Sequence, residues 1–484
     1  METVLNCTSG TLAPYLPSAT WPWNRQRAAH LYRRLGFGAP FLKQEQALAQ
    51  SPLSLVDEMI DAALSAPLST PPAWADWTFN DYTDFPAQIE EQFIEWLRTW
   101  ATDMLDNPLR GKMTLFWHNH FVTEYESYVC PSYLYRYHKV LQQHCLGNFK
   151  DFVYEIGKTP AMLVYLNGLQ NRAGDPNENY ARELYELFTL GADNGYTQQD
   201  IVETARALTG YTLVLVGCGD IYFNPFQWDN GTKSIFGQTG NWGYDDVVNI
   251  LFEQRPNEIA DFICRKLYRF FVHPEVDEAI VSGLAQTFLQ NNFELEPVLR
   301  QLFRSEHFFD EAVLGVQVKS PLELTFSFLI ESDLAIGQEM KELALYTSSQ
   351  LGQTLSIPPN VAGWPGNRAW ISTSTLTGRW NTIAYLMYAA WQQDPEQFRT
   401  FAQTVTGDPN SNMPELVAGA IIEQLVPIGL QTPELNERAY LAFKADIPEN
   451  YYASGQWNLN WETVPYQVLL LINYLARLPE FQLG

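Results

Sequence analysis

The residue types best suited to chemistry gather in one segment near the middle of the chain, which reads NENYARELYE. A carboxylate such as Glu183 can give or take a proton, and a guanidinium such as Arg182 can bind an oxyanion. We therefore predict that Glu183 is a catalytic acid or base and that Arg182 and Asn179 bind an anionic or polar substrate. The competing interpretation is a solvated helix face on which Arg182 pairs with Glu178 and Glu186, each four residues away.

Two histidines in the segment FWHNHF are the second candidates for proton transfer. We predict that His118 or His120 assists Glu183 in catalysis, because an imidazole titrates near neutral pH. Side chains two residues apart on a helix point about 200° from each other, so the two rings could share a metal ion only from an extended segment, with Glu183 or Asp229 as an oxygen ligand. The alternative is one buried, hydrogen-bonded histidine and one in a cleft. We assign no metal site and identify no cofactor.

A loop rich in proline and glycine, residues 358–366, contains Trp364 and is followed by Trp370. We predict that both indoles bind substrate by stacking on a sugar or an aromatic ring; the alternative is that they close one end of the helical core. Arg206 is a further predicted substrate-binding group. The predicted active site is a single pocket on which distant residues converge, namely His118, His120, Glu183, Arg206 and Asp229.

The central segment carries the signals of a helix. Asp175 suits an N-cap, Pro176 the first helical position and Glu178 the third position of a capping box. Gly191 suits a helix stop. The sequence therefore predicts one helix over residues 175–191.

Apolar residues at spacings of three and four predict helices along most of the remaining chain. The predicted fold is mainly α, a large multi-helix domain with one small β-hairpin insertion near 211–228. Residues 211–216 and 221–223 are the predicted strands, because they are β-branched or aromatic and flank a glycine-rich turn. Three parts are predicted along the chain: an extended N-terminal leader over 1–22, a helical core over 23–390, and a C-terminal helical part packed on that core over 391–484.

Charge and hydropathy exclude several classes of protein. The chain has 484 residues and a formal net charge of -25. Nucleic-acid binding needs clustered cations, so we expect no nucleic-acid partner. No apolar run of about 18 residues occurs, so we expect no membrane span. The first residues show no signal peptide, which predicts a cytoplasmic protein unless a leader has been removed.

The cysteines show no pairing pattern. Five are scattered without a CxxC motif, a spacing typical of neither a zinc site nor a disulfide framework. We therefore expect mostly reduced, structural cysteines at positions 7, 130, 145, 218 and 264.

The chain resembles the bacterial family called domain of unknown function 1800. The resemblance covers almost the whole length and rests on segments that include RRLGFG, FWHNHF, PNENYAREL, ARALTG and GWPG. It implies no agreed activity. Members are frequently exported and often neighbour a family similar to phosphatases and sulfatases, which implies such a protein as a partner. This chain has Trp228 and Arg255 where relatives commonly have histidine, so any role of those histidines is in doubt here.

Two functional hypotheses follow. The first is an enzyme of unknown reaction that acts on polar or anionic substrates, either glycans or phosphate- and sulfate-bearing molecules, in a helical cleft. The second is a non-catalytic binding or assembly protein that works with the phosphatase- or sulfatase-like partner.

Overall fold

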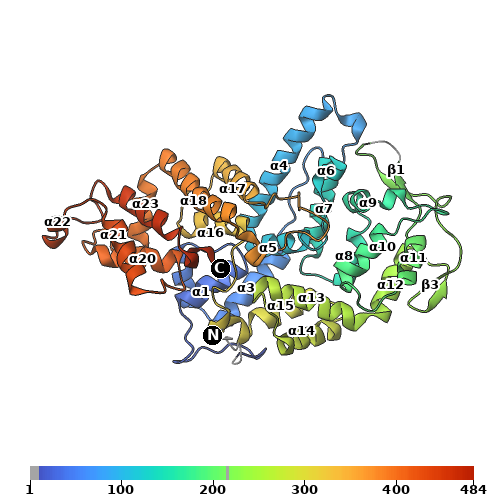
Figure 1. The fold of residues 1–484 in the computed structure, drawn as a ribbon, viewed down its shortest axis with the longest axis horizontal. Helices are drawn as coiled ribbons and strands as arrows, with labels where there is room; N and C mark the ends of the chain where they lie inside the picture. The colour runs from blue at the N-terminus through green and yellow to red at the C-terminus, as the bar shows by residue number, and fades with distance from the viewer. Residues whose placement is uncertain (1–9, 214–216) are drawn as a thin grey trace.

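A computed structural model describes residues 10–213 and 217–484, and it confirms the mainly helical fold (Figure 1). Helices account for 60% of the structure and strands for 5%. The helices before the first strand are α1 (Arg25–Arg34), α2 (Phe41–Leu48), α3 (Pro52–Ser65), α4 (Phe85–Asp106), α5 (Pro108–His118), α6 (Tyr125–Tyr128), α7 (Pro131–His144), α8 (Phe149–Ile156), α9 (Pro160–Tyr165), α10 (Asn179–Glu183), the π-helical η3 (Leu184–Thr189) and α11 (Gln198–Ala207).

The strands and the second set of helices follow. The strands are β1 (Tyr211–Leu213), β2 (Ile221–Phe223), β3 (Lys233–Ile235) and β4 (Gln238–Gly240). The later helices are α12 (Tyr244–Gln254), α13 (Pro256–Phe271), α14 (Glu278–Gln290), α15 (Leu295–Phe303), α16 (Pro321–Glu331), α17 (Gln338–Gln350), α18 (Thr373–Gln393), α19 (Glu396–Thr406), α20 (Pro414–Leu425), α21 (Pro433–Lys444), α22 (Glu449–Ala453) and α23 (Val464–Leu475). Short 3-10 turns are η1 (Phe79–Asp81), η2 (Gly168–Gln170), η4 (His307–Phe309), η5 (Glu311–Val313), η6 (Asn367–Trp370) and η7 (Pro479–Gln482).

The segment predicted as one helix over 175–191 consists of α10 and the wider turn η3. The predicted capping box is wrong. Asp175 lies in a turn before the helix, and its backbone N–H donates to the Arg172 oxygen, while the Glu178 carboxylate accepts a hydrogen bond from Arg182. Gly191 is the stop that the sequence indicated, since its φ of +92° is a conformation that glycine adopts without strain.

Two hairpins rather than one interrupt the helices. In the first, β1 runs antiparallel to β2 with Tyr211 opposite Phe223, which confirms the predicted hairpin, although residues 214–216 of its first strand lie outside the described residues. In the second, β3 pairs with β4 through a turn in which Phe236 and Gly237 have φ values of +46° and +79°. The sequence did not indicate this hairpin, because two-residue turns of this kind usually carry Asn or Asp before the glycine.

A buried network of charges joins α1, α5 and α16. Arg33 donates hydrogen bonds to both carboxylate oxygens of Glu331, at 2.6 and 2.7 Å. Lys112 pairs with Glu323 and donates to the backbone oxygen of Arg33 at 3.3 Å. The Arg34 guanidinium donates to a backbone oxygen of α13 at 2.9 Å. Buried charges are tolerated only when they are paired and hydrogen-bonded, so these contacts fix four helices relative to one another.

The C-terminal helices attach to the same region. Gln424 of α20 donates to the backbone oxygens of Ala39 and Glu331, at 3.3 and 3.1 Å. Arg379 of α18 donates to the Gln482 side chain at 2.6 Å. Figure 1 shows α19 to α23 at one end of an elongated molecule and both hairpins at the other, with α1, α5 and α16 between them.

Within the described ranges, no helix is both long enough and apolar enough to cross a bilayer. The most apolar run, residues 468–472, lies in α23. Val468, Leu471 and Ile472 are fully buried there, as the prediction of a core helix requires.

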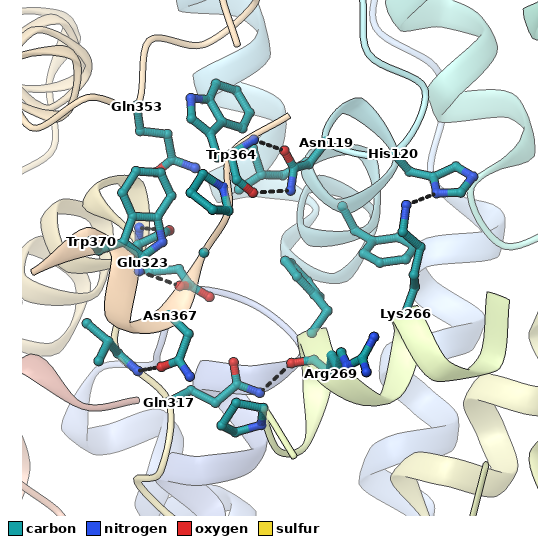
Figure 2. Close-up of a pocket in the computed structure, with 18 of the residues that line it drawn as sticks. Asn119, His120, Lys266, Arg269, Gln317, Glu323, Gln353, Trp364, Asn367 and Trp370 are labelled. Carbon is teal, nitrogen blue, oxygen red and sulfur yellow. Dashed lines mark hydrogen bonds between the residues drawn. The ribbon is translucent and has the colours of Figure 1, made fainter. Parts of the chain in front are cut away.

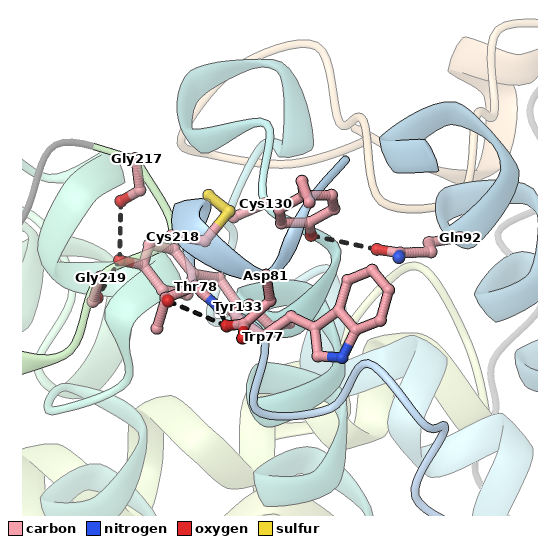
Figure 3. The surroundings of a disulfide bond; sticks show 11 residues. Trp77, Thr78, Asp81, Gln92, Cys130, Tyr133, Gly217, Cys218 and Gly219 are labelled. Atoms are coloured by element: carbon pink, nitrogen blue, oxygen red, sulfur yellow. Dashed lines mark hydrogen bonds between the residues drawn. A yellow bond between two sulfur atoms is a disulfide. The ribbon is translucent and has the colours of Figure 1, made fainter. Parts of the chain in front are cut away.

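A disulfide joins Cys130, directly before α7, to Cys218 in the β1–β2 turn, with 5.5 Å between their Cα atoms (Figure 3). The expectation of reduced thiols is therefore wrong for this pair, because cysteines separated by 88 residues leave no recognisable spacing in the sequence. The Tyr133 hydroxyl also donates to the backbone oxygen of Gly217 at 3.2 Å. Cys145 and Cys264 are reduced and buried, and Cys7 lies outside the described residues.

We predict that the double substitution Cys130→Ser and Cys218→Ser lowers the free energy of unfolding by about 2–4 kcal/mol, because the cross-link restricts a long loop of the unfolded chain. Urea denaturation with and without dithiothreitol checks this. Reduction should destabilise the wild-type protein and leave the double variant unaffected, and an equal response of the two proteins would contradict the assignment.

Candidate functional site

A cavity of about 400 Å³ opens where the C-terminal end of α5, α13, the start of α16 and the loop before α18 meet (Figure 2). Its wall is partly aromatic and partly polar. The residues that line it include Phe116, Asn119, His120, Lys266, Arg269, Phe270, Gln317, Glu323, Gln353, Trp364, Asn367 and Trp370.

The proline-rich loop is tied to the end of α5 by Asn119. Its Oδ1 atom accepts a hydrogen bond from the backbone N–H of Trp364 at 2.6 Å, and its Nδ2 atom donates to the Trp364 backbone oxygen at 3.1 Å. Gly363 has a φ of +77°, and a β-carbon there would collide with Asn119. The loop can therefore approach this closely only with glycine at that position.

Trp364 and Trp370 both line the cavity, which is where a stacking role would need them. They are also largely buried, at 4% and 8% exposure. Burial agrees with the interpretation that they close the core, and their place in the cavity wall leaves the stacking role a prediction.

Lys266 and Arg269 supply the positive charge of the wall. They lie one turn apart on α13. Burial and the neighbouring Arg269 lower the pKa of Lys266 to about 8. Neither cation forms an ion pair with a carboxylate of the described residues, and the exposed Arg269 guanidinium has no hydrogen bond there either.

His120 lies behind Lys266 and is 3% exposed. Its Nε2 atom is 3.0 Å from the backbone oxygen of Phe188, so Nε2 carries the proton, and its Nδ1 atom is 2.9 Å from Lys266 Nζ. Burial, together with the charge of Lys266, holds the His120 pKa well below its usual value. His120 is therefore a neutral acceptor for the lysine in the cavity wall.

His118 is a core residue. It is fully buried at the last position of α5 and does not line the cavity. Its Nε2 atom accepts from the Ser356 backbone N–H at 3.2 Å, and its Nδ1 atom is 2.9 Å from the Tyr137 hydroxyl. Burial lowers the His118 pKa to about 3, with a smaller contribution from His138.

We predict that the protein loses stability in mild acid. His118 has a pKa of about 3 when folded, against 6.5 for an ordinary histidine. Only the unfolded chain takes up this proton between these values, so the contribution of His118 to stability is complete above about pH 6.5 and falls by about 1.4 kcal/mol per pH unit below it. The other buried histidines with lowered pKa values, such as His120, add to this slope. Urea denaturation across this range measures the slope. His118→Gln should reduce the slope by about that amount, whereas the partly exposed His273→Gln should not. Equal slopes for His118→Gln and wild type would contradict the prediction.

The wall opposite Lys266 contains Glu323, which accepts a hydrogen bond from the Ser320 backbone N–H at 2.7 Å (Figure 2). Burial alone would raise the pKa of this carboxyl, but Lys112 and Arg34 lower it to about 2. Glu323 is therefore ionised and already paired with a lysine. The opposite wall thus has no carboxylate available to pair with Lys266 or Arg269.

The predicted cluster on α10 lies apart from this cavity. Arg182 pairs with Glu178 at 2.9 Å and with Glu186 at 3.3 Å, as the competing interpretation of a self-paired face describes. Glu183 is half-buried, and its pKa is raised by burial and by Glu186, against a lowering by Arg182. Asn179, like these residues, is absent from the cavity wall.

Arg206 and Asp229 form a third group. The guanidinium donates to both carboxylate oxygens of Asp229, at 2.8 and 3.2 Å, and pairs with Glu203 at 2.7 Å. The structure therefore distributes the five predicted residues among a core position, the cavity wall, the α10 face and this ion pair. It does not bring them together in the cavity.

Sequence reasoning missed Lys266 and Arg269, although a signal was present. Neighbouring Arg265 has Asp261 four residues before it and pairs with it at 2.9 Å. Lys266 and Arg269 have no acidic residue three or four positions away on either side. The sequence thus showed two cations in a predicted helix that have no acidic partner on the same helix.

No group of three or more histidine, cysteine, aspartate or glutamate side chains within 10–213 and 217–484 is arranged to hold a metal ion. Both ring nitrogens of His118 and of His120 already contact protein atoms.

Comparison with known proteins gives one match. A family model described as "Protein of unknown function (DUF1800)" matches residues 30–483. Neither the curated proteins nor the solved structures that were compared include a match to the chain.

Proposed function

Because the chain belongs to this family of proteins of unknown function, its activity must be inferred from its own site, and we propose that the cavity binds a small polar molecule that carries an oxyanion. A sugar bearing a phosphate, sulfate or carboxylate group is the chemical class that fits. The observation that carries the proposal is the pair Lys266 and Arg269, two cations in a cavity wall without a carboxylate partner.

The scarcity of cations in this chain strengthens that observation. There are 55 acidic residues against 30 lysines and arginines. Carboxylates are therefore in excess, and most buried or half-buried arginines form an ion pair with at least one carboxylate. Arg33, Arg206 and Arg265 are examples. Lys266 and Arg269 line the cavity without such an ion pair and therefore provide charge for an external anion.

The remainder of the wall suits the polar and apolar parts of such a ligand. Gln317, Gln353 and Asn367 present amides, and Trp370 and Phe116 present aromatic surface. Amides bind hydroxyl groups and aromatic rings pack against the C–H faces of sugars. The cavity volume of about 400 Å³ lies in the range of small-molecule sites.

We predict that Lys266→Met and Arg269→Gln each weaken the binding of inorganic phosphate, inorganic sulfate and a sugar phosphate by about tenfold or more, because each removes a charge-assisted hydrogen bond. Isothermal titration calorimetry measures the affinities. Arg477→Gln, at an exposed arginine outside the cavity, is the control and should bind as the wild type does. Absence of binding to the wild-type protein, or equal weakening by the control, would contradict the proposal.

Catalysis by Glu183 remains a separate prediction, supported by the raised pKa that an acid catalyst needs near neutral pH. We expect Glu183→Gln to lower any hydrolysis of phosphate, sulfate or glycosidic substrates by about a hundredfold. Glu186→Gln, the same substitution three residues later, should have a smaller effect. Screening of the purified proteins checks this. Wild-type inactivity on all three substrate classes, or unchanged activity of Glu183→Gln, would contradict the assignment.

A further inference from the structure

The Lys266 amine has one more hydrogen-bonding position than the surrounding protein atoms occupy. Its Nζ atom contacts two acceptors, His120 Nδ1 at 2.9 Å and the Leu187 backbone oxygen at 3.4 Å. An ammonium group has three N–H donors, and within the described residues no third acceptor faces this one. In the protonated amine, the third position around Nζ is an N–H group that requires an external acceptor. In the neutral amine, it is a lone pair.

The two protein contacts keep the amine oriented in either state. The Phe188 backbone oxygen fixes the proton of His120 on Nε2, so Nδ1 can only accept from the lysine. The Leu187 oxygen can likewise only accept. Both N–H groups of a neutral Lys266 thus have partners, and its lone pair is left free.

The surroundings also raise the fraction of Lys266 that is neutral amine above that of an ordinary lysine. The Nζ atom lies 5.0 Å from the centre of the Phe262 ring, and Phe116 and Phe270 line the cavity around it. Arg269 adds a like charge one turn away, and burial and that charge together lower the Lys266 pKa to about 8. A lysine activated in this way, by low polarity and a neighbouring cation, is a nucleophile toward carbonyl carbon.

We propose that Lys266 forms an imine with the carbonyl group of a ligand whose carboxylate is bound by Arg269, so that the cavity accepts small oxo acids and aldehyde acids. This rests on the proposed function, because the anion site is the one described there. In the step, the amine nitrogen attacks the carbonyl carbon. The C=O bond breaks, the C=N bond forms, and the oxygen leaves as water with the two amine hydrogens. No oxidant or reductant takes part.

Reductive trapping tests the proposal on the full-length protein. Glyoxylate supplies an aldehyde next to a carboxylate, and sodium cyanoborohydride converts any imine to a stable secondary amine. Peptide mass spectrometry then follows labelling at each lysine with time. We expect labelling at Lys266 to be at least about tenfold faster than at Lys139, a partly exposed lysine of α7 that serves as the internal control, because a larger fraction of Lys266 is neutral amine.

Arg269→Gln provides the test of orientation. It should slow the glyoxylate reaction at Lys266 more than the reaction with acetaldehyde, which has no carboxylate. If Lys266 is labelled no faster than Lys139 in the wild-type protein, the imine proposal is wrong. This comparison does not depend on the folding of any variant. If calorimetry then still shows phosphate binding that depends on Lys266, the proposed anion site stands alone. If neither is seen, both proposals fail.

Discussion

The pairing of buried cations with the two carboxylates of α16 is the interaction on which the rest of the structure depends. Glu331 binds Arg33 of α1, and Glu323 binds Lys112 of α5. Loss of one member of such a buried pair leaves an uncompensated charge and costs about 3–5 kcal/mol. Glu323 also belongs to the cavity wall, and Gln424 attaches the C-terminal helices at the end of α16. The positions of the cavity wall and of the C-terminal helices therefore depend on a single set of charge pairs.

The contrast between paired and unpaired cations is the basis on which we infer which charges bind a ligand. Arg206, which the sequence suggested as a substrate ligand, has two carboxylate partners and connects α11 to the segment before β3. Arg182 likewise has two partners on its own helix. Lys266 and Arg269 have none among the described residues, in a chain with a large excess of acid. Residue type does not show whether a charge already has a partner, so residue type alone is a poor guide to the site.

Local sequence signals predicted most of the fold. The features that they did not predict depend on tertiary contacts. The stop at Gly191 was correct because only local backbone geometry determines it. The capping box failed because Glu178 binds Arg182 and Gln198, a preference that the sequence signal does not contain. In the site, the loop around Trp364 was recognisable from its prolines and tryptophans. For Lys266 the sequence showed only that no acidic residue lies one helical turn away, because whether another helix supplies a partner depends on folding.

The cross-link between Cys130 and Cys218 has a consequence for the order of events during synthesis. Cys130 leaves the ribosome 88 residues before its partner, and Cys145 emerges in the interval. Until α7 folds, these two thiols are close along the chain and free to react with each other. In the finished protein Cys145 is buried and its pKa is raised to about 12, so almost no thiolate remains to compete. Once α7 has formed, its 14 residues separate Cys130 and Cys145 by about 20 Å along the helix axis, which excludes a bond between them.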